Sequence, residues 1–493
     1  MSIRKLVGET VIYGVSSILS RILNYVILTP ALTRIFTNGE YGIVSELFFY
    51  AGFLTVLFTY RMETAFFRFG SKSDNLDKAY STAAISLLCS TLVFAGIFIS
   101  FSEGLARFLN YPDNVEFVQI VVLIIAFDAL MAIPFARLRL ENRPIKFAAL
   151  KIAHILINIL FFFFFLQFCP LLIDRGFDFF KNIYNPENTI QYVFIANLLA
   201  SGFVFLMLLP EYFKIKPIFD FSYWKEMFWY ALPLVVVGFA AIINQLGAIP
   251  LLSRFLPDAV EANRAATGTY GATLKLAVLM NLFTQAFNYA AEPFFFRHSK
   301  EKGSKEMYGQ VGLLFTMVGS IVFLGIMLYI DIIQLFLGKD FRSGIEVVPI
   351  LLIANLLLGI YYNFSIWYKL ADKTIWGAYI SIGGALITIL VNLALIPTYS
   401  YLGSAWATLS CYGFMVMACY WTGKRFYPIP YPIARMLMLI AVAIGFYLVS
   451  TFIRTWVGSN LLALLGLNTL LFVAFLGIIY LLEGRTVRKI LIN

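Results

Sequence analysis

The stretch Glu63-Thr-Ala-Phe-Phe-Arg68 returns later in the chain as Glu292-Pro-Phe-Phe-Phe-Arg297. Each copy closes a long apolar segment that opens with Tyr-Gly, at position 41 in the first copy and position 270 in the second. The segments 41–68 and 270–297 have the same length, and ten of their 28 aligned positions are identical. The chain is therefore predicted to consist of two related halves.

The composition places these halves in a membrane. Of the 493 residues, 61% are hydrophobic and only 13% are charged, which exceeds what a soluble core needs. A membrane-spanning helix takes about 20 apolar residues, and the apolar segments do not alternate as barrel strands do. Fourteen spans are predicted: 10–33, 42–62, 79–101, 115–137, 145–168, 190–210, 226–248, 268–292, 310–332, 346–368, 374–396, 402–422, 432–453 and 460–482.

The predicted fold is an all-α polytopic membrane protein with about 14 transmembrane helices. Each half contains six spans, so both copies start on the same side of the membrane and form a parallel repeat, as in many transporters. The predicted lobes are residues 1–215 and 216–426. Two extra helices in residues 427–493 have no counterpart in the repeat and are predicted to be appended.

The basic residues predict the topology. The net charge is +10, and 24 of the 37 Lys and Arg residues lie in one set of loops and both termini, against nine in the opposite loops. Because basic residues accumulate on the cytoplasmic side, both termini are predicted to be cytoplasmic. The charge is thus explained without a nucleic-acid partner. The four cysteines form no CxxC pair, so no metal site is expected.

Arg21 is the most informative charge inside a span. A charge at the bilayer centre is costly and normally faces a protein interior or a wet cavity. Tyr13, Ser17, Arg21 and Asn24 share one face of the first helix by their spacing. A structural hydrogen bond to a neighbouring helix is the alternative, but a cavity is favoured because no acid accompanies Arg21 on that helix.

A second polar stripe lies in the eighth span. Asn281, Gln285, Asn288 and Glu292 follow helical spacing, and Lys275 lies off this stripe, where it lines a cavity or reaches the interface. Glu292 and its copy Glu63 fall at the predicted cytoplasmic ends of their helices. Together with the repeated arginines, these two acids are predicted to form an inner gate or to help couple transport to an ion. The full set is Glu63, Arg68, Glu292 and Arg297.

Asp128 in the fourth span is a candidate coupling acid. It carries a proton in one interpretation and neutralises a cation such as Lys151 in the other. His154 shares a helix face with Lys151, but a single histidine is more often a packing residue than a relay. No cofactor is predicted, and H⁺ and Na⁺ both remain open as coupling ions.

No catalytic residue is predicted, and the protein is not expected to be an enzyme. The sequence contains no Walker P-loop, no HExxH and no GxSxG. The outer loops are also too short for the acidic site of a membrane glycosyltransferase.

The order and spacing of several motifs resemble bacterial polysaccharide flippases of the multidrug, oligosaccharidyl-lipid and polysaccharide exporter superfamily. The resemblance covers essentially the whole chain and includes the 6+6+2 arrangement of spans. The motifs are Pro30-Ala-Leu-Thr-Arg34 before Glu40-Tyr-Gly42, the Ala-Phe-Phe-Arg68 closure, the basic loop Arg137-Leu-Arg-Leu-Glu-Asn-Arg143, and Asn392-Leu-Ala-Leu-Ile-Pro397 before Gly403-Ser-Ala-Trp-Ala-Thr408.

This resemblance implies alternating access around a cationic cavity in the bacterial inner membrane. The implied cargo is an undecaprenyl-diphosphate-linked oligosaccharide for surface polysaccharides such as lipopolysaccharide, and polysaccharide polymerases are implied partners. Arg21 and then Lys275 are expected to hold the diphosphate, because cations bind phosphate strongly in a low-dielectric cleft. Amides suited to contact sugar are Asn24, Asn244, Gln245, Gln285 and Asn288.

Other functions remain open at the level of sequence. A lipid II flippase would share the fold and mechanism. A drug or cation antiporter would need a dominant acidic cavity, which Arg21 disfavours. A membrane glycosyltransferase or polymerase is disfavoured by the short outer loops.

Overall fold

The structure is a computed structural model that describes residues 19, 22–71, 76–216, 218–299, 301, 303–458 and 460–492. Within these ranges the chain is helical and contains no strand. Eleven of the described helical segments are long and apolar enough to cross a membrane. The predicted all-α polytopic fold is therefore confirmed.

Two of the three remaining predicted spans lie within longer described helices. Helix α18 (Ile375–Phe426) has 52 residues and contains a non-helical residue, Ser400, with φ of 49° and ψ of −133°, so it holds two spans. Helix α13 (Val260–Arg297) is 38 residues long and contains the predicted span 268–292. The first predicted span lies mostly outside the described residues; its described end contains η1 (Asn24–Leu28) and α2 (Thr29–Ile35).

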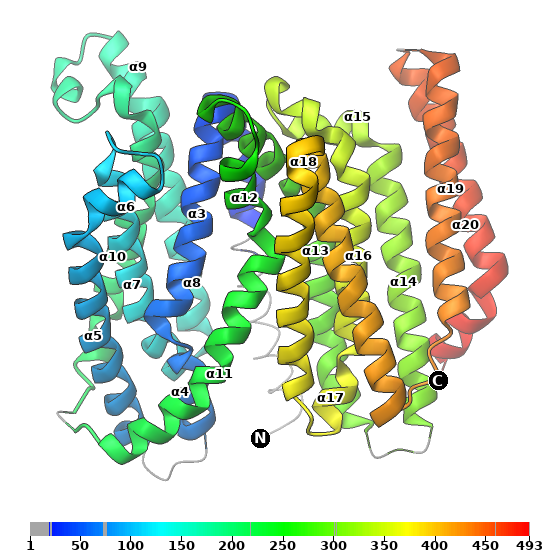
Figure 1. Cartoon of the computed structure of the whole chain (residues 1–493), viewed down its shortest axis with the longest axis horizontal. Helices are drawn as coiled ribbons and strands as arrows, with labels where there is room; N and C mark the ends of the chain where they lie inside the picture. The colour runs from blue at the N-terminus through cyan, green and yellow to red at the C-terminus, as the bar shows by residue number, and fades with distance from the viewer. Residues whose placement is uncertain are drawn as a thin grey trace. The chain divides into compact units, whose positions relative to one another are not determined.

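The chain packs into two compact units, whose helices are labelled in Figure 1. Unit 1 comprises residues 1–31 and 43–242, and unit 2 comprises residues 32–42 and 243–493. Most of α11 (Phe221–Leu246) thus groups with the first unit, although the predicted lobe boundary was residue 215. The reason is its packing, because the Phe239 ring lies 4.3 Å from that of Phe53. The Trp224 indole also donates to Ser86 Oγ at 2.6 Å.

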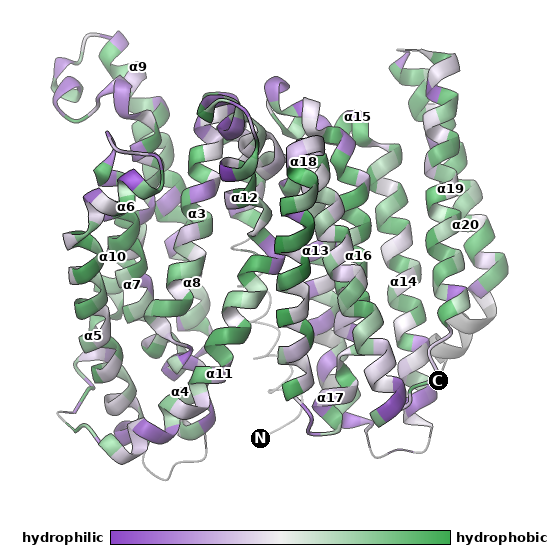
Figure 2. Cartoon of the chain, viewed as in Figure 1, coloured by the Kyte–Doolittle hydropathy of each residue, from purple (hydrophilic) through white to green (hydrophobic). Residues whose placement is uncertain are grey.

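Unit 1 is built around three long helices. Its core joins Met131, Phe135 and Leu138 of α7 to residues of α8 and α10. These three residues are spaced by four and three positions, so they form one apolar stripe. Hydrophobic residues cover most of these helices, as Figure 2 shows. Its helices are α3 (Asn38–Thr59), α4 (Met62–Gly70), α5 (Leu76–Ser100), α6 (Ser102–Phe108), α7 (Val115–Leu140), α8 (Pro144–Phe163), η2 (Phe164–Phe168), α9 (Cys169–Asp174), η3 (Asp178–Asn182), η4 (Pro186–Asn188) and α10 (Thr189–Tyr212).

A buried acid ties the ends of these helices together. The Glu211 side chain is only 1% exposed and accepts hydrogen bonds from Arg143, Lys146 and Lys214 at 3.1, 2.7 and 2.6 Å. Its backbone carbonyl accepts a hydrogen bond from the Tyr80 hydroxyl at 2.9 Å. We call these residues the Glu211 cluster. It joins α5, α8 and α10 and thereby fixes the spacing of the helices that carry the candidate site.

Unit 2 contains the second half of the repeat and the C-terminal helix pair. The Arg454 guanidinium of α19 makes two hydrogen bonds to Asp331 at 2.7 and 2.6 Å, and Asn468 of α20 donates to Leu328 O at 2.7 Å. The predicted appended helices are thus bonded to α15, through Asp331, and to the end of α14, through Leu328. The helices of this unit are α12 (Ala248–Phe255), α13, α14 (Ser304–Leu328), α15 (Ile330–Ile333), η5 (Gln334–Phe336), η6 (Lys339–Val347), α16 (Val348–Phe364), α17 (Ile366–Leu370), α18, α19 (Ile433–Val457) and α20 (Leu461–Ile492).

The segment 32–42 packs into unit 2 through a glycine contact. A Cβ atom on Gly268 would lie 1.8 Å from Asn38 O, and one on Gly42 would lie 2.1 Å from Arg264 O. The Asn38 amide donates to Thr269 Oγ1 at 2.8 Å and to Asp340 O at 3.1 Å. Only glycine allows the two backbones to approach this closely.

Gly268→Ala is therefore expected to destabilise the protein by about 1–3 kcal/mol, the range for overpacked sites. The matched control is Gly96→Ala, because nothing lies within 4 Å of a Cβ atom at that helical position. Thermal unfolding of both purified variants in detergent measures the difference. Equal melting temperatures would show that the backbone contact adjusts without cost.

Candidate functional site

The first copy of the repeated segment is broken where the second is continuous. Between α3 and α4, Tyr60 and Arg61 adopt φ angles of 33° and 56°. Their aligned positions, 289 and 290, lie inside the unbroken helix α13. Left-handed backbone is uncommon for residues other than glycine and is concentrated at functional sites. The break therefore points to a role that belongs to the first copy.

Arg61 lines a polar cavity of about 410 Å³ inside unit 1. The cavity lies between α3, α4, α7 and α8. Its charged and titratable lining residues are Arg61, Glu63, Asp128, Arg139, Lys151 and His154. The cations Arg61, Arg139 and Lys151 outnumber the two acids. We call this space the polar cavity; its volume is within the usual range of about 300–1,000 Å³ for ligand pockets.

A hydrogen-bonded chain of three side chains lies at one wall of the polar cavity. Ser201 Oγ donates to Asp128 Oδ1 at 2.9 Å, and His154 Nε2 lies 3.1 Å from the same Ser201 oxygen. A serine hydroxyl has a single proton. Since this proton goes to Asp128, His154 Nε2 acts as the donor to Ser201. The arrangement connects an acid of α7 to a histidine of α8 through α10.

Lys151 and Arg61 provide positive charge near this chain. The Lys151 ammonium lies 4.2 Å from the centroid of the Phe135 ring, within the range of cation–π attraction. Arg61 Nη1 lies 3.8 Å from Glu63 Oε1. Burial raises the pKa of the Glu63 carboxyl, and the nearby Arg61 and Arg139 act against this rise. Glu63 Oε2 is buried and has no hydrogen-bond partner among the described residues.

The predicted gate residues have partners in their own units. Glu292 Oε1 accepts a hydrogen bond from Lys369 Nζ at 2.6 Å, within unit 2. The Arg68 guanidinium lies 4.2 Å from the centroid of the Tyr230 ring, within unit 1. Arg297 is exposed at the end of α13. The gating role of these residues stays a prediction.

The predicted diphosphate and sugar residues are distributed over the two units. Arg21 lies outside the described residues. Asn24 is exposed in the π-helix η1 of unit 1; such helices are frequent at functional sites. In unit 2, Asn244 is buried and donates to Ser381 O at 3.1 Å, which ties α11 to α18.

The other three predicted amides and Lys275 occupy more accessible positions of unit 2. Lys275 and Gln245 are exposed, and Asn288 is half-buried. The Gln285 amide donates to Asn281 Oδ1 at 3.0 Å, as expected for two residues on one helical stripe. The substrate-binding role of these residues stays a prediction.

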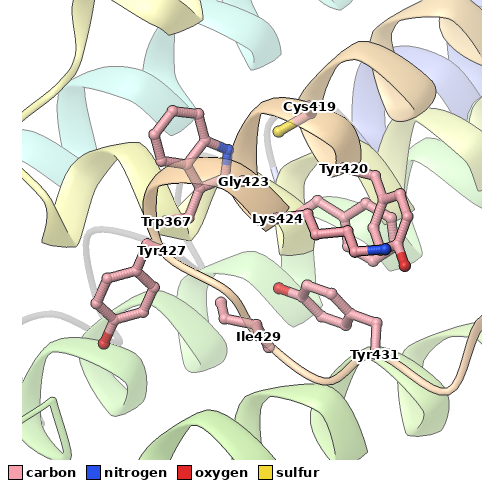
Figure 3. A pocket seen from close by; sticks show the side chains of 9 residues that line it. Trp367, Cys419, Tyr420, Gly423, Lys424, Tyr427, Ile429 and Tyr431 are labelled. Atoms are coloured by element: carbon pink, nitrogen blue, oxygen red, sulfur yellow. The ribbon is translucent and has the colours of Figure 1, made fainter.

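A second space, in unit 2, is too small to hold a sugar. Its volume is about 10 Å³ and it lies among Trp367, Cys419 and Tyr431 (Figure 3). This volume corresponds to roughly one water molecule. The polar cavity is therefore the stronger candidate.

Sequence reasoning missed three members of the polar cavity network. Ser201 is one of many serines in apolar spans and carries no distinguishing pattern. Arg61 follows directly after an apolar segment and Arg139 lies in a basic loop, so neither is distinguished by its place in the sequence. Comparison of the two repeats contained a usable signal, because Arg61 aligns with Ala290 in an otherwise similar stretch.

Comparisons with known proteins agree with the fold. Residues 31–171 match the family model described as a polysaccharide biosynthesis protein. No curated protein sequence matches the chain. Among solved structures, a lipid II flippase MurJ in an inward closed conformation aligns with a TM-score of 0.71 and 15% identity, covering 95% of this chain and 99% of that chain.

Two MATE transporters show the same architecture. An inward-facing MATE family transporter of the MOP superfamily aligns with a TM-score of 0.55 and 11% identity, over 83% of this chain and 98% of that one. The eukaryotic MATE transporter AtDTX14 aligns with a TM-score of 0.52 and 11% identity, over 89% and 97%. The predicted resemblance is thus supported over residues 31–171 by a polysaccharide biosynthesis family model, and over nearly the whole chain by the fold that it shares with these transporters.

Proposed function

We propose that the protein is a flippase that moves an undecaprenyl-diphosphate-linked oligosaccharide from the cytoplasmic to the outer leaflet. The cargo serves surface polysaccharide assembly, where polymerases take it up. The observation that carries this proposal is the polar cavity, in which cations outnumber acids among membrane-spanning helices. A diphosphate needs such cations, whereas its lipid tail can remain in the bilayer.

The roles of individual residues follow from their chemistry. Arg21 and then Lys275 are proposed to bind the diphosphate, as the sequence predicts. Arg61 is a further cation, at the wall of the polar cavity. Asn24, Gln245, Gln285 and Asn288 supply amides to sugar hydroxyls, while Asn244 supports them from the interior. The chain Asp128–Ser201–His154 carries the coupling proton, because acids and histidines joined by hydrogen bonds are the usual proton relays of transporters.

Reconstitution tests this function directly. Purified protein in liposomes receives a fluorescent undecaprenyl-diphosphate-linked oligosaccharide, and an impermeant quencher reports the fraction in each leaflet. We expect a rise in translocation above empty liposomes. Parallel arms contain fluorescent lipid II, a cationic dye and a fluorescent phospholipid. Movement of only lipid II would indicate a lipid II flippase, and movement of only the dye would indicate a cation antiporter. Extension of the sugar chain would indicate an enzyme.

The lipid II flippase is the second candidate because its fold aligns over nearly the whole chain. The match of residues 31–171 to a polysaccharide biosynthesis model favours the oligosaccharide. An antiporter for cations is disfavoured, because the polar cavity has more basic than acidic residues.

We also propose that both termini face the cytoplasm. In a Cys89→Ser background, Glu301→Cys should resist an impermeant maleimide in intact cells and react after permeabilisation. Glu187→Cys is the matched control and should react in intact cells, because it lies in a predicted outer loop. Both positions are exposed. Labelling of Glu301→Cys from outside would reverse the topology.

A further inference from the structure

The Glu211 cluster belongs to a wider set of ion pairs at one end of α8 and α10. Further pairs lead from Arg143 through Glu141 to α5 and α7. We call this set the basic network. Among the described residues that it joins, five are basic and three are acidic, so it carries an excess of two positive charges. Its members are Arg137, Arg143, Lys146, Lys214 and Lys216, with Asp77, Glu141 and Glu211.

Three cations of this network are held side by side at its surface. Arg143 Nη1 and Lys146 Nζ contact the same oxygen of Glu211, and Lys214 Nζ contacts the other oxygen. The carboxylate is buried, whereas each of the three cationic side chains is partly exposed. An ammonium has three N–H donors and a guanidinium has five. The bonds to Glu211 therefore leave donors for a further anion.

Exposed apolar side chains lie directly beside these cations. Phe213, which precedes Lys214, is 84% exposed, and Ile145, which precedes Lys146, is 76% exposed. Exposed apolar groups of this size are unfavourable in water and favourable against lipid. The ends of α8 and α10 thus combine positive charge with an apolar surface, as is typical of a membrane interface.

The apolar surface continues along α10 into the membrane. Phe203, Leu206, Pro210 and Phe213 are all exposed and follow spacings of three, four and three residues, so they share one helical face. They extend over about 15 Å of helix, which is about half of the ~30 Å hydrocarbon thickness. The helix is long and apolar enough to cross a membrane. The stripe therefore has the length of an acyl chain in one leaflet.

We propose that the basic network and this stripe bind an acidic glycerophospholipid of the surrounding bilayer. Its phosphodiester contacts Arg143, Lys146 and Lys214, and an acyl chain lies along α10. Basic pockets between membrane helices bind acidic head groups in this way. An acidic lipid lowers the positive excess, whereas a zwitterionic lipid brings its own cation and leaves the excess unchanged.

The site is distinct from the proposed cargo site and has a different role. None of its three cations lines the polar cavity. By reducing the repulsion among them, the phosphate would stabilise the junction of α5, α8 and α10. Binding of an acidic lipid should therefore raise the melting temperature, as any ligand that binds only the folded state does.

Native mass spectrometry of the purified, delipidated protein tests the proposal. Phosphatidylglycerol is titrated, and the fraction of protein that carries one lipid gives the dissociation constant. Phosphatidylcholine with the same acyl chains should bind about tenfold more weakly, the effect of losing a charge-assisted contact. Glycerol phosphate, which supplies the head group without chains, should not displace phosphatidylglycerol at equal concentration.

Two variants separate the charged part of the site from its apolar part. Lys146→Gln with Lys214→Gln keeps the Arg143–Glu211 pair and should weaken phosphatidylglycerol binding by about tenfold. Phe213→Ser changes an exposed side chain and should weaken it by about fivefold, because apolar contact with the chain is lost. Thermal unfolding without lipid verifies that each variant is folded.

Lys225→Gln with Lys424→Gln is the matched control. It removes the same charge from two exposed lysines outside the basic network and should leave the affinity unchanged. An equal loss in this control would show attraction to net charge rather than a site. Lys146→Arg with Lys214→Arg keeps both charges and should retain most of the binding.

Several results would overturn the inference. These are equal affinity for phosphatidylglycerol and phosphatidylcholine, unchanged affinity in both the double glutamine variant and Phe213→Ser, or displacement by glycerol phosphate. The last result would indicate a site for free anions. The inference does not rest on the proposed function, because lipid binding is measured without translocation. Each can therefore fail while the other holds.

Discussion

Asp128→Asn should reduce transport by roughly a hundredfold, the lower end of what a positioned proton-transfer group contributes in enzymes. The asparagine keeps an oxygen that accepts the Ser201 hydrogen bond, which is 2.9 Å long with aspartate. It removes the group that can gain and lose a proton. The fold should therefore persist while coupling is lost. Transport is measured in liposomes with an imposed pH or sodium gradient, and thermal unfolding confirms the fold.

Two comparisons make this result specific. Asp113→Asn removes an exposed acid outside the polar cavity and should leave transport unchanged. Ser201→Ala breaks the link to His154 while keeping Asp128. If the three residues act as a relay, this variant should lose as much transport as Asp128→Asn does. Gradient-driven transport by Asp128→Asn at the normal rate would eliminate the coupling role.

Glu211→Ala should destabilise the protein by about 3 kcal/mol, the lower end of the range for breaking a buried ion pair. The lower end applies because its three cationic partners are partly exposed, with side-chain exposures of 41%, 31% and 40%. Without the carboxylate these cations repel one another at the junction of α8 and α10. A loss of this size should lower the melting temperature and the amount of protein in the membrane.

Glu103→Ala is the matched control for this experiment. Its carboxylate is 3.9 Å from Arg107, and both side chains are more than 70% exposed. Such surface pairs contribute little, about 0–1 kcal/mol. If the two glutamate variants melt at the same temperature, the Glu211 cluster does not hold the helices together.

The sequence was sufficient to predict the fold because membrane helices can be recognised by the length and hydrophobicity of their segments. The span 268–292, which lies within α13, was predicted in the same way as the others. The packing of α11 was harder to foresee. It depends on contacts such as Phe53 with Phe239, which join residues far apart in the chain.

The candidate site was only partly predictable for a similar reason. Asp128 is noticeable because acids are rare within spans, and the structure adds its partners. Ser201 is unremarkable by type, and His154 was weighed as a packing residue because no relay partner is near it in sequence. The hydrogen bonds that connect them cross 73 and 47 residues. Such long-range pairings are set by helix packing, which a single sequence does not reveal.

The left-handed pair at Tyr60 and Arg61 also bears on the history of the chain. A gene duplication yields two copies with the same sequence and function, and each copy can then accumulate its own substitutions. The second copy keeps the tyrosine and the flanking Glu-x-x-Phe-Phe-Arg pattern but carries alanine in place of the arginine. Its helix runs on without interruption. The common scaffold is thus present in both copies, while the unusual backbone and its cation are found in the first, so ancestral reconstruction at these two positions would show which copy departed from the shared ancestor.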